Sequence, residues 1–157
     1  MDDPAPPSAG FRVIALVASV GGLAAFESLL SDLPADFPAA VLLLQHLEPN
    51  RPSLLAEILS RYTNLPVRQA QPGDRLRPGA IFIAPPDRHL LVDRDGVLSL
   101  AATERIHFVR PAADRLLESV ARAARERASS GRRPAVPDGD TVPWPAGGRG
   151  GALGHAG

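Results

Sequence analysis

The chain has 157 residues, in which 17 Lys and Arg are balanced by 17 Asp and Glu, so the formal net charge is zero. This length suits one domain with a sizeable core, and the charge balance lacks the basic excess of a nucleic-acid-binding protein. The chain contains no cysteine, which excludes disulfides, thiolate catalysis and cysteine-ligated metal sites. We therefore expect one packed domain with no metal, no cofactor and no nucleic-acid partner.

The amino-terminal residues 1–10 (MDDPAPPSAG) are acidic and proline-rich, without the basic start and apolar core of a signal peptide. We expect them to form a disordered leader. The longest apolar stretch, residues 13–26, is interrupted by Ser19, Gly21 and Gly22 and is shorter than the roughly 20 residues that span a bilayer. The sequence therefore predicts a cytoplasmic protein without membrane insertion.

The first predicted elements are a strand, a tight turn and a helix. Residues 13–17 are a short apolar run without polar alternation, which is typical of a strand buried on both faces of a parallel sheet. After Ser19 and a glycine pair, apolar residues recur at helical spacing, at Leu23, Phe26, Leu29 and Leu30. This arrangement puts a hydroxyl in the crevice where open α/β sheets bind ligands.

Two ordinary interpretations of this turn stay open. Serine is a preferred residue type at a helix N-cap. From this residue alone, an N-cap and a nucleophile are equally weighted interpretations of Ser19. The glycine pair could approach a nucleotide phosphate, but the loop lacks the first glycine of a dinucleotide fingerprint. A helix amino terminus also favours an anion or a developing oxyanion.

A second apolar strand, residues 40–44, ends at Gln45 and His46. A helix from Pro52 to about Tyr62 follows, and its expected apolar face consists of Leu54, Leu55, Ile58 and Leu59. Strand, helix, strand and helix in this order predict parallel neighbouring strands about 4.8 Å apart. Ser19 and His46 would then emerge at the same edge, although a solvated loop histidine is an alternative for His46.

The remaining elements complete one domain. We expect strands over residues 65–70 and 80–84, a turn at 72–74, and a hairpin of residues 89–92 and 97–100 around Asp95-Gly96. His89 is expected to be structural rather than part of the site. A helix over residues 111–127 carries Asp114 in its first turn, and its expected core face consists of Ala113, Leu116, Leu117, Val120 and Ala124.

From about residue 128 the composition changes. Residues 129–157 hold eight of the 14 glycines and four prolines, and they contain no apolar run of strand or helix length. Such a segment cannot bury enough apolar surface to order itself. We therefore expect residues 128–157 to be a disordered Gly/Pro/Arg-rich tail.

With these residues in hand, the sequence resembles the catalytic domain of the chemotaxis protein-glutamate methylesterases, the CheB type. The resemblance covers about residues 11–127, and its motifs come in the family's order: 18–22 (ASVGG), 45–46 (QH), 73–74 (GD), 83–86 (IAPP) with 89–90 (HL), and 110–111 (RP) with Asp114. It implies an α/β fold, a three-layer doubly wound, mostly parallel sheet with helices on both faces.

The resemblance also implies a mechanism. Ser19 would be the nucleophile and His46 the general base, and the backbone N–H groups of Val20 and Gly21 would hold the oxyanion. The substrate would be a glutamate γ-methyl ester on a methyl-accepting chemotaxis receptor, with methanol as the leaving group, or a glutamine that is deamidated. The alternative is a non-catalytic remnant of the same fold that only binds the receptor.

Three departures from the family qualify this expectation. Val20 stands where relatives have a small or hydroxylated residue, and no receiver domain precedes the domain, so we expect control by a separate response regulator. The family continues with a strand and a Thr-Gly-x-Gly-x-Asp-Gly loop whose aspartate orients the histidine, whereas Asp138 lacks a preceding strand and is not assigned this role.

The third departure has two consequences. Removing the orienting acid from such a triad costs about 10⁴-fold in turnover, so activity is expected to be weak or absent. We also predict that the carboxyl-terminal part of the sheet is missing and that the sequence after about residue 127 is out of its original reading frame.

Overall fold

The computed structural model describes residues 12–19, 21–46, 53–102 and 112–129. The predicted leader and the predicted tail beyond Ser129, which includes Asp138, lie outside these residues. Within them the elements follow in the order β1 (Arg12–Ala18), α1 (Leu23–Ser31), β2 (Ala39–Gln45), α2 (Leu55–Leu59), β3 (Val67–Gln69), β4 (Ile81–Ile83), β5 (His89–Val92), β6 (Leu98–Ala101) and α3 (Ala113–Ser129).

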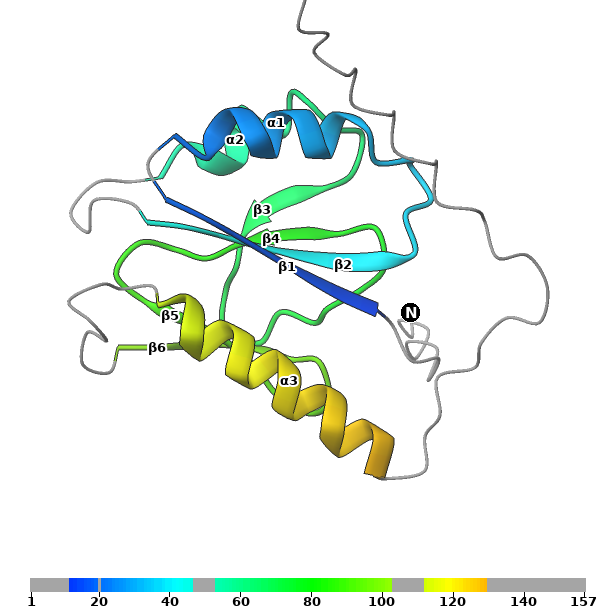
Figure 1. Ribbon diagram of the computed structural model, residues 1–157, viewed down its shortest axis with the longest axis vertical. Coiled ribbons are helices and arrows are strands. Elements are labelled where there is room, and N and C mark those ends of the chain that lie inside the picture. Colours follow the sequence, from blue (N-terminus) through cyan, green and yellow to red (C-terminus); the bar gives the residue numbers. More distant parts are fainter. Residues whose placement is uncertain (1–11, 20, 47–52, 103–111, 130–157) are drawn as a thin grey trace, which may run out of the picture.

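Four strands form a parallel sheet in the order β1-β2-β4-β3, and β5 and β6 form a separate antiparallel pair. Helices α1 and α2 lie on one side of the four-stranded sheet, and α3 lies on the other side with the β5–β6 pair (Figure 1). The predicted α/β architecture, mostly parallel and covered by helices on both faces, is therefore confirmed.

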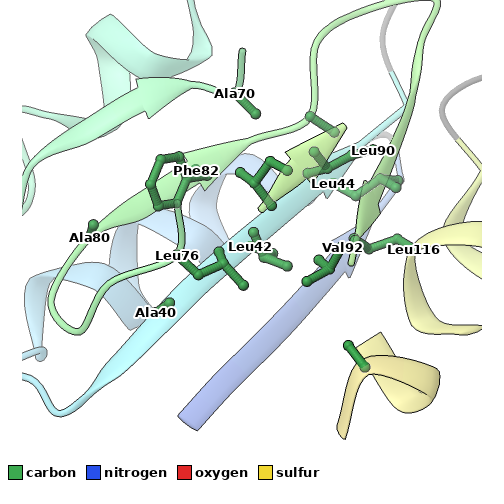
Figure 2. Packing of buried hydrophobic residues seen from close by; sticks show 13 residues of the cluster. Ala40, Leu42, Leu44, Ala70, Leu76, Ala80, Phe82, Leu90, Val92 and Leu116 are labelled. Atoms are coloured by element: carbon green, nitrogen blue, oxygen red, sulfur yellow. The ribbon is translucent and has the colours of Figure 1, made fainter. Parts of the chain in front are cut away.

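Strand β2 is the centre of the core. Its residues 39–44 are all at most 3% exposed, as expected for an uninterrupted apolar strand in a covered parallel sheet. Val41 and Leu43 pack among side chains of α1 and α2, whereas Ala40, Leu42 and Leu44 pack into the other layer. Figure 2 shows this second cluster, in which residues of β2 and β4 meet Leu90 and Val92 of the hairpin and Leu116 of α3.

Strand β1 corrects one expectation. Its apolar run predicts burial on both faces, but β1 is at the edge of the sheet and pairs only with β2 among the described strands. Ile14 is 38% exposed and Val17 is 40% exposed. An apolar run indicates that a strand prefers a buried environment. It does not indicate whether another strand lies on each side of it.

The hairpin is confirmed, with β5 and β6 in antiparallel register and Gly96 at φ 77° in the connecting turn. Helix α3 is fixed to this hairpin by two buried hydrogen bonds. The Ser119 hydroxyl accepts the Val92 N–H at 3.0 Å, and His89 Nδ1 accepts the Ala112 N–H at 3.1 Å. His89 is fully buried, in agreement with the structural role expected for it.

The turn before β4 is held by Asp74. Its carboxylate accepts a hydrogen bond from Arg68 at 2.7 Å and another from the Gln71 N–H at 2.9 Å. The Arg68 guanidinium also lies 5.1 Å from the centroid of the Phe82 ring. The Gly-Asp pair noted in the sequence therefore connects the end of β3 to the turn that follows it.

The apolar faces of the helices were predicted only in part. The buried residues of α3 are Leu116, Ser119 and Ala123, and Ala112 directly before the helix is also buried, whereas Leu117 and Ala124 are exposed. Leu29 of α1 and Leu54 before α2 are likewise exposed, and α2 is limited to Leu55–Leu59. Each of these helices has apolar residues on two neighbouring faces, and the position of the sheet determines which face is buried.

Strand bounds also differ. The predicted strands 65–70 and 80–84 are shorter, as Val67–Gln69 and Ile81–Ile83, although Ala80 and Ala84 at the flanks are buried. Helix α3 continues to Ser129, slightly beyond its predicted end. These shifts of a few residues are usual at the ends of elements.

Candidate active site

The register between β1 and β2 brings the two principal candidates together. The paired residues run from Arg12 with Ala39 to Ala18 with Gln45. Beyond the last pair, the His46 N–H still donates to the Ala18 carbonyl at 3.4 Å. Ser19 and His46 are therefore the next corresponding positions, on adjacent strand ends spaced about 4.8 Å apart.

The turn after β1 leaves the Ser19 side chain free of a capping role. Helix α1 has Gly22 as its N-cap, with no side-chain cap hydrogen bond. The Ser19 carbonyl accepts the Gly22 N–H at 3.0 Å, which closes a tight turn, and the Ser19 side chain is exposed. The N-cap interpretation of Ser19 is therefore wrong, and its hydroxyl stands in solvent at the carboxyl edge of the sheet.

Both glycines of the turn have a structural reason. Gly21 has φ +89°, and an added Cβ would meet nothing within 4 Å, so this side of the turn is open. An added Cβ on Gly22 would collide with the Ala18 Cβ and lie 3.1 Å from the Ser19 carbonyl oxygen. The glycines thus let the chain reverse direction directly behind the hydroxyl. Val20, between Ser19 and Gly21, lies outside the described residues.

Two buried polar atoms lie next to this turn without a hydrogen-bond partner in the described part of the chain. They are His46 Nε2 and Gln45 Oε1. Leaving a buried donor or acceptor unpaired costs about 1–3 kcal/mol, so native proteins keep few of them. Two such atoms on consecutive residues at the carboxyl end of a strand are typical of a binding or catalytic site.

Gln45 is a residue for which the sequence analysis assigned no role. The signal was present, because an amide ends a strand that is otherwise entirely apolar. Its side chain is register-paired at the level of Ala18, directly before the turn that carries Ser19. The described part of the site therefore consists of a hydroxyl, an imidazole, an amide and an open glycine turn.

This set of groups matches nucleophilic acyl chemistry. A serine hydroxyl is activated when an imidazole accepts its proton, and the developing oxyanion needs N–H donors near the attacked carbon. No hydrogen bond joins Ser19 Oγ to His46 within the described residues. Such bonds are often long or misaligned before substrate binds, so proximity is the relevant feature.

A separate cavity of about 460 Å³ lies between α3 and the β5–β6 hairpin. Its lining combines acidic residues with Arg94, Arg115 and Arg122, and it contains none of the site residues predicted from the sequence. Among the described residues, no group of three or more His, Asp or Glu side chains could hold a metal ion. No described helix is long and apolar enough to cross a bilayer.

Comparison with known proteins places this geometry in a family context. The model of the family described as CheB methylesterase matches residues 14–131. A protein-glutamate methylesterase/protein-glutamine glutaminase of Symbiobacterium thermophilum is 39% identical over 116 residues, which are 74% of this chain and 32% of the relative. One of Myxococcus xanthus is 43% identical over 111 residues, covering 71% of this chain and 31% of the relative.

A solved structure agrees with these matches. The crystal structure of the Thermotoga maritima CheB methylesterase catalytic domain is similar with a TM-score of 0.67 and 31% identity, covering 72% of this chain and 61% of that chain. The chain spans about a third of the length of the curated relatives it matches. Residues 132–157 lie beyond the family match, and the change of reading frame stays a prediction.

Proposed function

Because this chain belongs to the CheB methylesterase family, we propose that it is a carboxylic-ester hydrolase that removes γ-methyl esters from protein glutamates. The relatives' names also include protein-glutamine glutaminase, so glutamine deamidation by the same site is part of the proposal. The substrate proteins would be methyl-accepting chemotaxis receptors, acted on in the cytoplasm. A separate response regulator would supply any control by phosphorylation.

The observation that carries the proposal is the parallel register of β1 and β2. It continues to the His46 N–H and the Ala18 carbonyl, directly beside the turn that begins with Ser19. In the proposed reaction Ser19 Oγ attacks the ester carbonyl carbon while His46 accepts the hydroxyl proton. The C–O bond to the methoxy group then breaks, and methanol leaves with that proton.

The second half of the reaction reverses these roles. Water attacks the acyl-serine carbonyl as His46 accepts one of its protons, and the Ser19 oxygen leaves and is reprotonated. The oxyanion in each step needs N–H donors that carry no other bond. The N–H groups of Val20 and Gly21 are our candidates, and the open space beside Gly21 supports access of an acyl group.

The unpaired Nε2 of His46 gives further support. A nitrogen that is buried without a partner is available to accept a proton from an incoming group. Its desolvation is tolerated if substrate or the serine hydroxyl completes the hydrogen bond during reaction. The adjacent Gln45 amide would then contact the substrate from the same strand end.

Methanol release from a methylated receptor, incubated with the purified full chain, tests the proposal. Ser19→Ala is expected to lower the rate by up to about 10²-fold, because the nucleophile is lost from a triad for which no orienting acid has been assigned. Ser28→Ala is the matched control, since Ser28 is an exposed serine on α1, and it is expected to leave the rate unchanged. Ammonia release from a glutamine-containing receptor tests deamidation in the same series.

A chain that only binds the receptor would give different results in these assays. Receptor binding by the wild-type chain, with no methanol or ammonia above the rate of the Ser19→Ala variant, would refute the hydrolase and support the remnant. Equal turnover in the wild-type and Ser19→Ala chains would refute the assigned nucleophile. A rate that falls equally in both serine variants would point to a change of folding instead.

A further inference from the structure

The positions of Ser19 and His46 in the chain indicate which face of the sheet they belong to. The side chains of β1 and β2 that pack toward the β5–β6 hairpin and α3 occupy every second position, at Val13, Ala15, Ala40, Leu42 and Leu44. Continuing this alternation past the end of the paired segments places Ser19 and His46 on the same face. A substrate that contacts both groups therefore approaches the carboxyl edge of the sheet from the side of the hairpin and α3.

The loop between β4 and β5 borders the same region. Strand β4 pairs with β2 on the side away from β1, and after the last register pair the Ala84 N–H donates to the Leu43 carbonyl at 2.8 Å. Residues 85–88 then lead from the carboxyl end of β4 into the hairpin, and Figure 1 shows this loop at the end of the sheet where β1 and β2 also end. The hydrogen bond from the Ala112 N–H to His89 Nδ1 joins the start of the hairpin to the start of α3. Residues 85–88 therefore lie beside the candidate site, on the side of β4.

This loop has a fixed conformation. Pro85 is buried and Pro86 is half-buried, and the ring of each proline restricts its φ angle. Asp87 has φ 57°, and in the described part of the chain it is the one non-glycine residue with a positive φ. Residues held in such conformations cluster at active sites and ligand-binding sites. The loop therefore presents the next residue, Arg88, in a defined position beside the site.

Arg88 is exposed, and most of its hydrogen-bonding capacity is unused. Its Nη1 donates to the Asp87 carbonyl at 3.2 Å. Among the described residues it forms no ion pair, even with the neighbouring Asp87, whereas Arg61 and Arg68 are each paired with a carboxylate. A guanidinium has five N–H donors in a planar fork that fits the two oxygens of a carboxylate. Arg88 therefore provides a carboxylate-binding group at the edge of the candidate site.

We propose that Arg88 is a substrate-recognition residue, which binds the carboxylate of an unmodified glutamate or aspartate close to the reacting residue of the substrate protein. The inference rests on the proposed function, because it takes the substrate to be a protein segment that contains glutamates. A methyl-esterified glutamate carries no charge, so Arg88 binds a neighbouring residue and leaves the ester to Ser19 and His46. The site thereby selects esters that lie in acidic segments.

Binding of two fluorescent receptor peptides to the full chain, followed by fluorescence anisotropy, is the first measurement. Both peptides contain the same methyl-esterified glutamate, and in the second peptide serine replaces every unmodified glutamate and aspartate. Arg88→Ala is expected to raise the Kd of the acidic peptide by about fivefold, less so in high salt, and to leave the Kd of the serine peptide unchanged. Arg125→Ala is the matched control, since Arg125 is also exposed, bonds only to a backbone carbonyl and lies towards the far end of α3. It is expected to change neither Kd.

Methanol release from the same peptides is measured separately, so that the inference and the proposed function can fail independently. Arg88→Ala is expected to raise KM on the acidic peptide by about fivefold and to leave kcat unchanged, because Arg88 contacts no reacting atom. Absence of methanol release, together with weaker binding of the acidic peptide alone, would refute the hydrolase and still support recognition by Arg88. The inference would be overturned if the wild-type chain bound the acidic peptide no more tightly than the serine peptide. An equal loss on both peptides in Arg88→Ala, or an equal effect of the two arginine variants, would also overturn it.

Discussion

Replacing His46 with leucine is expected to leave the fold at least as stable, whereas the same replacement at His89 destabilises it. The two histidines differ in their hydrogen bonds. His46 Nε2 is buried with no partner in the described part of the chain, whereas His89 Nδ1 accepts the Ala112 N–H at 3.1 Å. The two leucine variants therefore compare a histidine that destabilises the fold, His46, with one that stabilises it, His89.

The magnitudes follow from these contacts. Leucine at position 46 removes an unpaired buried nitrogen whose desolvation costs about 1–3 kcal/mol, and some packing is lost, so we expect a gain of about 1 kcal/mol. At position 89, which is 0% exposed, leucine leaves the N–H of Ala112 without its acceptor, and Ala112 is itself only 3% exposed. That change is expected to cost about 1–3 kcal/mol.

Urea unfolding followed by circular dichroism measures the difference. The two variants are expected to differ by at least about 2 kcal/mol in the free energy of unfolding, which corresponds to roughly 8 °C in the thermal midpoint. Methanol release should be lost in the His46→Leu variant despite its stability. If His46→Leu unfolds as easily as His89→Leu, His46 is a structural anchor and the reasoning from its unpaired nitrogen is refuted.

Three further substitutions test other parts of the structure. Gly22→Ala adds a Cβ that collides with Ala18, so the turn must shift; methanol release should fall strongly, and an unchanged rate would argue against a rigid turn. Ser119→Ala removes the acceptor of the buried Val92 N–H and should cost about 1–3 kcal/mol in urea unfolding, with loss of under about 0.5 kcal/mol contradicting the contact. Asp74→Ala removes a 2.7 Å ion pair that is partly exposed, and the expected cost in the same assay is about 1 kcal/mol, decreasing in high salt.

The central elements could be predicted from the sequence because local pattern and final environment agree. Residues 40–44 read as an apolar strand and are fully covered, and Asp95-Gly96 between two apolar runs marks a hairpin that the structure contains. Strand β1 has the same apolar pattern as β2 and yet lies at the edge of the sheet that the described strands form. The number of neighbours is a property of the whole sheet, so no local pattern could report it.

The buried face of α3 shows a second reason for error. Leu117 and Ala124 have apolar side chains and were expected in the core, but Ser119 and Ala123 are buried instead. Ser119 can be buried because its hydroxyl both accepts the N–H of Val92 and donates to the Leu116 carbonyl. A hydropathy pattern treats serine as polar and does not anticipate that both of its hydrogen bonds are made inside.

For the candidate site, the sequence predicted which backbone positions lie close together, but it did not predict the surroundings of their side chains. Parallel neighbouring strands have their carboxyl ends at one edge, and this rule alone brought Ser19 and His46 together. The unpaired atoms of Gln45 and His46 were not predictable, because they depend on how tightly the surroundings close over each side chain. The roles of Ser19, His46, Val20 and Gly21 in catalysis stay predictions until the serine and histidine variants are assayed.

The parallel pairing of β1 with β2 determines how far apart Ser19 and His46 lie in the proposed reaction. Sliding one strand by a single residue would carry the serine about 3.3 Å along its neighbour and turn alternate side chains to the opposite face. Thirteen of the fourteen ladder positions, 12–18 and 39–44, carry arginine or aliphatic side chains that take no part in the reaction. The spacing between the hydroxyl and the imidazole is thus set by ordinary core packing. A substitution far along these strands that disturbs their pairing would therefore lower turnover as well as stability.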